Sequence, residues 1–284
     1  MQRRSLLTAG GAVLAAPYIL RSAEAASEPF DPKNADHISM AHRKMVYTAD
    51  DSVTFTWLRA MRYIMIDGVL TPLWELHSGL MYRTVDRPDG GYDVHAISTI
   101  YYTDIASEKF IETFKNPFTG QTVTFPYAQP TAPKPAVRVT HFTKTGPAAE
   151  AVTATGVKVA ARDNTLGPAW VIGYQLILRA DSSMRLEPTE PGKRMSQVND
   201  WLTYTARVSE VMDPNAKNVQ SIQSFNDLNT VPLWFGMEDR AGNWIGRGFG
   251  KKVFRFDDMP KIWRELFTAK NPQIAKDPKA ALGA

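Results

Sequence analysis

Residues 81–97 read MYRTVDRPDGGYDVHAI, and this stretch decides the fold. Apolar and polar side chains alternate on both sides of a central RPDGG, which is typical of strands with one buried face. A proline at the second position and a glycine at the fourth position of Arg87–Gly90 are typical of a type I turn closed by a left-handed glycine. The stretch therefore predicts an antiparallel β-hairpin.

A second hairpin is predicted a short way along the chain. Residues 110–114 (FIETF) and 122–125 (TVTF) flank NPFTG at 116–120, which has the same turn chemistry. The following residues, 126–135, hold four prolines, which exclude a central strand or a helix. We therefore expect a surface crossing there.

Other runs with a period of two predict further strands, at residues 137–142, 151–159, 170–179, 201–211, 218–223 and 242–256. The most apolar of them, 170–179, should be buried on both faces or line a cavity. A helix is expected at 259–268, capped by Asp257 or Asp258 and ended by Asn271-Pro272. It should pack against an open barrel mouth or a sheet through Met259, Ile262, Trp263, Leu266 and Phe267. A second helix is expected near 54–62.

Many short strands and few helices predict a mostly β protein, an antiparallel barrel or sandwich with a short C-terminal helix. The expected organisation is a signal peptide at 1–25, an N-terminal extension at 26–49, one β-rich domain at 50–270 and a tail at 271–284. A closed barrel of eight or more strands can enclose one small ligand.

The first 25 residues look like a twin-arginine (Tat) export signal. The pair Arg3-Arg4 precedes a short apolar stretch, 6–20, and 23–25 (AEA) is a small-x-small cleavage sequence. We expect cleavage after Ala25, passage through the Tat machinery and a periplasmic location. The alternatives are an uncleaved anchor and a cytosolic amphipathic start. No later segment reaches 18 consecutive apolar residues, so no stable membrane span is expected.

Composition and missing motifs exclude several function classes. The 284-residue chain has a formal net charge of +4, and its basic residues are scattered among acidic ones, so nucleic acid is not expected as a partner. The chain has no cysteine, which excludes disulfides, cysteine-ligated metals and a cysteine nucleophile. Motifs of serine hydrolases, zinc proteases and nucleotide-binding loops are absent, and the sequence identifies no cofactor. The run GRGFG at 246–250 predicts a bulged or closely packed strand.

Two segments resemble the family of unknown function DUF1838. Residues 114–123 (FKNPFTGQTV) are similar to its strand–Asn-Pro-aromatic-Thr-Gly–strand signature, and 231–242 (VPLWFGMEDRAG) are similar to its Pro-aromatic–Gly-x-x-Asp-Arg-x-Gly segment. The resemblance covers most of residues 40–270 and implies a calycin-type barrel. It implies no activity, substrate or site residue.

Polar residues on two predicted strands indicate an acid–base site. Alternation puts Glu75, His77 and Arg83 on one face, and the hairpin brings His95 roughly opposite Arg83 or Met81. A histidine moves a proton near neutral pH, a carboxylate orients it and an arginine binds an anionic group. The alternative is a solvated polar face, which half-exposed strands show by default. A three-histidine metal site is a further alternative, but no ligand spacing indicates one, so no metal is predicted.

Large aromatic residues on the strands indicate an apolar pocket with phenolic donors, suited to an aromatic or polycyclic ligand. The alternative is that these rings fill a solid barrel core. The ligand-binding candidates are Tyr102, His141, Trp170, Tyr174, Trp201 and Tyr204.

These features favour an exported β-barrel protein that binds a small, largely apolar or aromatic molecule. The alternative is a cofactor-independent lyase, isomerase or hydrolase that uses strand-borne His and Glu residues inside the barrel. An enzyme of this kind would hold Glu75, His77 and His95 within hydrogen-bond reach in one cavity.

Overall fold

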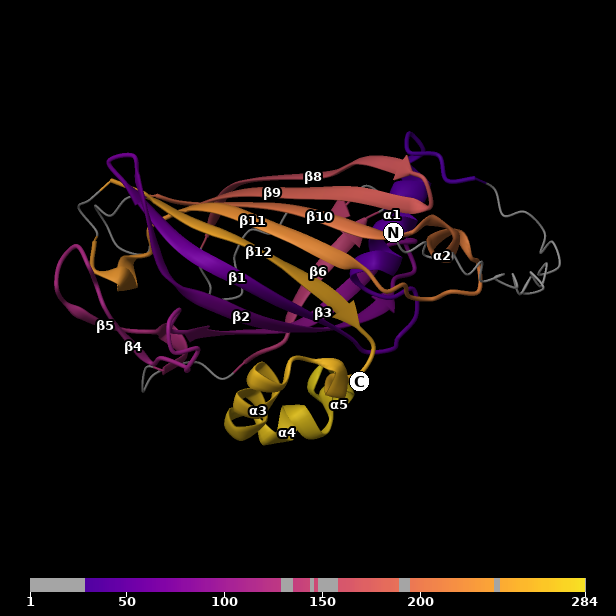
Figure 1. The fold of residues 1–284 in the computed structure, drawn as a ribbon. Helices are drawn as coiled ribbons and strands as arrows, with labels where there is room; N and C mark the ends of the chain where they lie inside the picture. The colour runs from indigo at the N-terminus through magenta and orange to yellow at the C-terminus, as the bar shows by residue number, and fades with distance from the viewer. Residues whose placement is uncertain are drawn as a thin grey trace, which may run out of the picture.

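The computed structural model describes residues 29–128, 135–143, 146–147, 158–188, 195–237 and 241–283. Its main strands are β1 (Thr54–Ile66), β2 (Val69–Asp86), β3 (Tyr92–Thr103), β6 (Arg138–Thr143), β7 (Gly146–Pro147), β8 (Val159–Ile172), β9 (Gln175–Leu186), β10 (Ser196–Arg207), β11 (Ile222–Thr230) and β12 (Asn243–Val253). They form one antiparallel sheet in the order β7-β6-β3-β2-β1-β12-β11-β10-β9-β8, which curls into the shape of a barrel (Figure 1). The two ends of this order meet, since β7 contacts β8. The predicted mostly β fold is confirmed as a nearly closed barrel.

Both predicted hairpins are confirmed. The first joins β2 to β3, where Gly90 has a φ of 80° and its N–H donates to the Arg87 carbonyl at 3.1 Å. The second forms a separate two-stranded sheet of β4 (Thr113–Lys115) and β5 (Thr122–Thr124). Its turn contains Gly120 with a φ of 72°, a conformation that glycine adopts without strain.

Two element predictions are wrong. The helix expected near 54–62 is part of strand β1, because both faces of this strand pack against apolar groups and the resulting run of large residues imitates a helix. The strand expected at 170–179 is instead a hairpin, in which Gly173 with a φ of 60° separates β8 from β9. Of the strand expected at 151–159, residues 151–157 lie outside the described residues.

Other predicted boundaries differ by several residues. The end of the strand expected at 201–211 forms a short helix, α2 (Val208–Met212), and β11 begins only at Ile222. The proline-rich segment begins with a short 3₁₀ turn, η1 (Pro126–Ala128), and residues 129–134 lie outside the described residues.

Helix α1 (Ala35–Val46) enters one end of the barrel. Asn34 caps it by accepting hydrogen bonds from the N–H groups of Asp36 and His37. Its buried face, which includes Met45, packs with Leu176 of β9 in one apolar cluster. The helix therefore belongs to the core of the barrel.

Short helices at the C-terminus cover the outside of the sheet below β2 and β3 (Figure 1). They are η3 (Phe256–Asp258), α3 (Lys261–Lys270), α4 (Pro272–Lys276) and α5 (Pro278–Ala281). Helix α3 confirms the expected helix, displaced by two residues, and it ends at Asn271 as expected. Its N-cap is Pro260 rather than an aspartate, and it buries Trp263 and Phe267 against the sheet. No helix in the described part of the chain is long and apolar enough to cross a membrane.

Candidate functional site

Helix α1 identifies the inward face of the sheet, because residues at its end touch opposite walls of the barrel. Tyr47 packs edge-on against Tyr82 of β2 and Phe142 of β6, with ring centroids 5.0 and 5.4 Å apart. His42 packs on Tyr204 of β10 at 6.3 Å. Since strand residues alternate between the two faces, residues in phase with these rings point into the barrel.

The other end of the interior is filled by an aromatic cluster around Trp74 of β2, which is fully buried. Its ring centroid lies 4.6 Å from Phe114, 4.8 Å from Phe125 and 5.9 Å from Phe235, all in edge-on contacts. Phe235 belongs to the 3₁₀ turn η2 (Leu233–Phe235) that follows β11. Both ends of the barrel are therefore closed by side chains.

Between the two ends, the inner wall carries a buried ion pair. Arg62 of β1 donates from Nη1 to both carboxylate oxygens of Asp227 of β11, at 2.7 and 2.9 Å. The two side chains are only 7% and 4% exposed, and the N–H of Gly246 also donates to Asp227. The pair is therefore satisfied and electrically neutral, as buried charges require.

A second carboxyl, Asp200 of β10, lies directly opposite Asp227 on the inner wall. Among the described residues, Asp200 makes no hydrogen bond or ion pair. Burial and the charge of Asp227 raise the pKa of Asp200 to about 6, while Arg62 and Arg138 act in the opposite direction. A half-buried carboxyl with this pKa can take up or release a proton near neutral pH.

The inner wall around Asp200 is only partly buried. Leu202, Phe225 and Ala180 point inward from β10, β11 and β9, and each keeps part of its surface exposed. Ile100, on the inner face of β3, is 38% exposed, since β6 pairs with β3 only as far as Ala96. Solvent therefore reaches an inner wall that combines apolar side chains with a free carboxyl.

Glu75 and His77 lie together, but on the outward face of β2. Their side chains approach to 3.8 Å, Glu75 pairs with Arg59 at 2.6 Å, and His77 Nε2 lies 3.0 Å from the hydroxyl of Thr103. Burial and the nearby Arg59 lower the pKa of His77, which favours the neutral ring. The pair does not face the interior.

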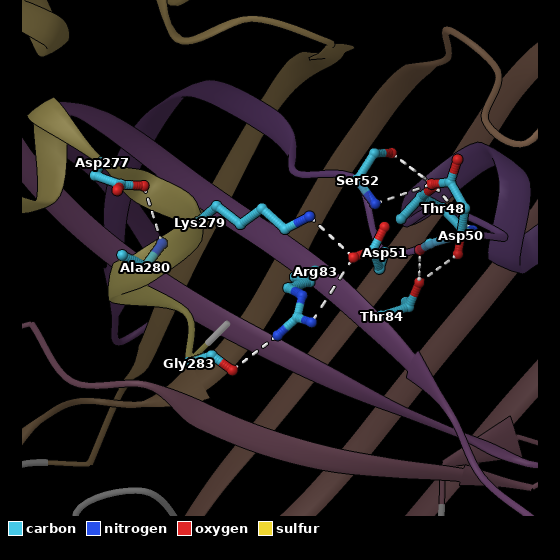
Figure 2. A network of polar contacts seen from close by, with 10 residues as sticks. All are labelled: Thr48, Asp50, Asp51, Ser52, Arg83, Thr84, Asp277, Lys279, Ala280 and Gly283. Atoms are coloured by element: carbon cyan, nitrogen blue, oxygen red, sulfur yellow. Dashed lines mark hydrogen bonds and ion pairs between the residues drawn. The ribbon is translucent and has the colours of Figure 1, made fainter.

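Arg83 and His95 are cross-strand partners, which is one of the two pairings that the hairpin predicted for His95. Both hold the C-terminal segment against the outside of the sheet. Arg83 Nη1 donates to the Gly283 carbonyl at 2.8 Å, and His95 Nδ1 lies 2.9 Å from the Leu282 carbonyl. Figure 2 shows Arg83 beside Asp51, which Lys279 also contacts at 2.9 Å.

The four predicted catalytic residues therefore do not converge. His77 pairs with Tyr101, which is six residues along β3 from His95, a separation of about 20 Å in a strand. His141 is also outward, where its Nδ1 lies 2.7 Å from the carboxylate of Asp93.

The predicted ligand-binding aromatics fall into two groups. Tyr102 and Tyr204 point into the barrel, one at the aromatic cluster and the other beside α1. Trp170 and Trp201 point outward and are 45% and 43% exposed, and Tyr174 lies at the tip of the β8–β9 hairpin and is 69% exposed. The expectation that 170–179 is buried on both faces is therefore wrong: Leu176 and Leu178 are fully buried on the inner face, whereas the outward side chain of Trp170 and the hairpin tip at Tyr174 are exposed.

The glycine run 246–250 is a closely packed strand, as predicted. A Cβ at Gly248 would lie 2.1 Å from the Arg59 carbonyl, and one at Gly250 would lie 2.2 Å from the Trp57 carbonyl. These glycines let β12 approach β1 closely, which is the role of glycine at sharp bends of a barrel.

Sequence reasoning did not select the interior charges Arg62, Asp200, Asp227 and Arg138. The sequence nevertheless contained an indication of Arg62: it lies two residues from Ala60 and two from Ile64, so all three share one face of the strand. A charged residue in the apolar phase of a strand indicates either an ion pair or a binding group inside the barrel. The wrong helix prediction for this segment hid that signal.

Within the described ranges, no group of three or more His, Asp or Glu residues is placed to hold a metal ion. No family model matches the chain, and no curated protein or solved structure matches it. The resemblance to DUF1838 stays a prediction.

Proposed function

We propose that this protein binds a small, largely apolar or aromatic molecule inside its barrel. One observation carries the proposal: inward side chains of β9, β10 and β11 stay partly exposed although both ends of the barrel are filled. In a barrel with a solid core these positions would be buried. Leu202 and Phe225 would contact the apolar body of the ligand, and Tyr102 and Asp200 would meet its polar groups.

We further propose that the protein acts after export through the Tat machinery, in the periplasm. This part rests on the leader alone, which lies outside the described residues.

The enzyme alternative has less support from the site. It requires Glu75 and His77 to act inside the barrel, whereas their strand phase puts them on the outer face, with His77 only 6% exposed. A group that is covered on the outside of the sheet has little room for a substrate.

The test uses the neutral fluorescent probe N-phenyl-1-naphthylamine, an apolar aromatic molecule, titrated into the purified protein. We expect saturable binding with a fluorescence increase. Leu202→Trp fills the inner wall and should weaken probe binding by about tenfold or more, the scale of losing one well-packed apolar contact. The matched control is Thr203→Trp, which puts the same ring on the outer face of the same strand and should leave the affinity unchanged.

Two results would contradict this function. One is a wild-type protein that does not bind the probe. The other is equal binding by the two tryptophan variants, which would place the probe elsewhere on the molecule.

A further inference from the structure

We propose that the ligand of the barrel is an anionic amphiphile, with an apolar or aromatic body and a carboxylate or a similar oxyanion, and that Arg138 of β6 binds the anion. This inference rests on the proposed function, because it names the polar end of the same interior site.

Most interior cations are already neutralised or held. Arg62 is paired with Asp227, as described above. Lys252 of β12 is 1% exposed, and its Nζ donates to the carbonyls of Lys44 and Tyr47 at the end of α1. These groups serve the fold and offer no charge to a ligand.

Once these groups are set aside, Arg138 of β6 is the cation that matters on the inner wall. It is in the inward phase, opposite Ala96. Arg162 of β8 is also in the inward phase, opposite Met184, but its Nε donates to Asn164 at 3.2 Å. Within the described part of the inner wall, Asp200 is a carboxyl without a cation partner, and its raised pKa brings it partly into the neutral form near pH 6. A wall whose guanidinium stays charged while its unpaired carboxyl is partly neutral attracts an anion rather than a cation.

Arg138 is the cation best placed to meet a ligand. Its side chain is exposed, and among the described residues it has no hydrogen bond or ion pair. Its charge nevertheless acts on inward groups, since it lowers the pKa of the Tyr47 and Tyr82 hydroxyls against the larger raising effect of burial. A guanidinium in this position can hold both oxygens of a carboxylate.

Phenolic hydroxyls complete the polar end of the site. Tyr47, Tyr82 and Tyr204 come from different elements, and among the described residues none of their hydroxyls makes a hydrogen bond. Burial raises all three pKa values, so the hydroxyls stay protonated and can donate to an anion. Free donors beside a free guanidinium are the groups that an oxyanion requires.

Asp200 makes the affinity for an anion depend on pH. The charged and titratable groups that act on it are Asp227, Arg62 and Arg138, and its own charge acts on Tyr204. Above pH 6 the ionised carboxyl repels an anion, and below pH 6 the neutral carboxyl does not. Affinity for an anion that does not itself titrate should therefore rise as the pH falls from 8 to 5.

The test compares two probes that differ only in one anionic group, 8-anilinonaphthalene-1-sulfonate and its neutral analogue N-phenyl-1-naphthylamine. We expect Arg138→Gln to weaken binding of the sulfonate by about tenfold, the scale of a lost charge-assisted hydrogen bond, and to leave the neutral probe within about twofold. Arg185→Gln is the matched control, because Arg185 is exposed on the outward face of β9. It should change neither affinity.

A second variant tests the pH dependence. Asp200→Asn should bind the sulfonate more tightly than wild type at pH 8 and should lose the increase in affinity toward pH 5. If Arg138→Gln leaves the ratio of the two affinities unchanged, or if Asp200→Asn keeps the wild-type pH profile, the assignment is wrong. The neutral probe separates the failures: when it still binds inside the barrel, the proposed function stands and only the anionic ligand is refuted.

Discussion

Replacing Arg62 with methionine should strongly destabilise the protein. Methionine keeps the apolar stem of arginine but removes the guanidinium that donates to both oxygens of Asp227. Asp227 would then be an ionised carboxylate with a 4% exposed side chain, opposite Asp200 and with the Gly246 N–H as its remaining donor. A buried charge that loses its partner keeps the whole cost of its dehydration.

The expected loss in the free energy of unfolding is about 3–5 kcal/mol. For a domain of this size each kcal/mol lowers Tm by about 2–4 °C, so Tm should fall by roughly 6–20 °C. Combining Arg62→Met with Asp227→Asn removes the unpaired charge and keeps an acceptor for Gly246. The double variant should therefore recover most of the loss.

Urea unfolding at pH 8 measures these values. Arg247→Met, on the exposed outward face of β12, is the control and should change stability by less than about 0.5 kcal/mol. A double variant as unstable as Arg62→Met alone would refute the argument, because the unpaired charge would then not be the cause.

Two further predictions concern the packing around the barrel. Gly79→Ala would place a Cβ 2.2 Å from two ring carbons of Trp263, so we expect the free energy of unfolding, measured in urea, to fall by about 1–3 kcal/mol. The fall should be smaller when Trp263 is also replaced by leucine, and an unchanged unfolding midpoint would contradict the contact. Burial lowers the pKa of Lys252 to about 7 in the folded protein, from its ordinary value of 10.5. Between these two pH values Lys252 is protonated in the unfolded chain and neutral in the folded protein. The free energy of unfolding should therefore rise with pH in this range, by on the order of 1 kcal/mol per pH unit. Lys252→Met should lack this rise in urea unfolding measured across that range, and a variant with the wild-type slope would disprove the assignment.

Local turn chemistry was the most reliable guide to the fold. Arg87–Gly90 and Asn116–Gly120 each contain a residue whose conformation only glycine adopts easily, and both hairpins form where they were expected. The wrong predictions fall where local pattern is ambiguous. The sequence of β1 has large apolar residues in both strand phases, so its polarity does not alternate although its burial does, and the apolar run at 170–179 hides a turn at Gly173.

The candidate site was harder to predict. The turn narrowed the cross-strand partner of His95 to Arg83 or Met81, of which the structure has Arg83, and the common face of Glu75 and His77 followed from alternation. Neither argument tells which face of a strand points into the barrel. Both faces of β2 are partly covered, one by the barrel interior and the other by the C-terminal helices. The pattern of apolar residues in its sequence therefore does not show which face is the inner one.

The sequence alone therefore determined the strand-rich class, the two hairpins, the C-terminal helix and the close packing of the glycine run, because each depends on residues near one another in the chain. Only the tertiary structure decided which side chains face inward, since that depends on the curl of the whole sheet and on where α1 and the C-terminal helices dock. The same curl brings Arg62 to Asp227 across 165 residues, and it places Asp200 and Arg138 on the wall that a ligand would meet.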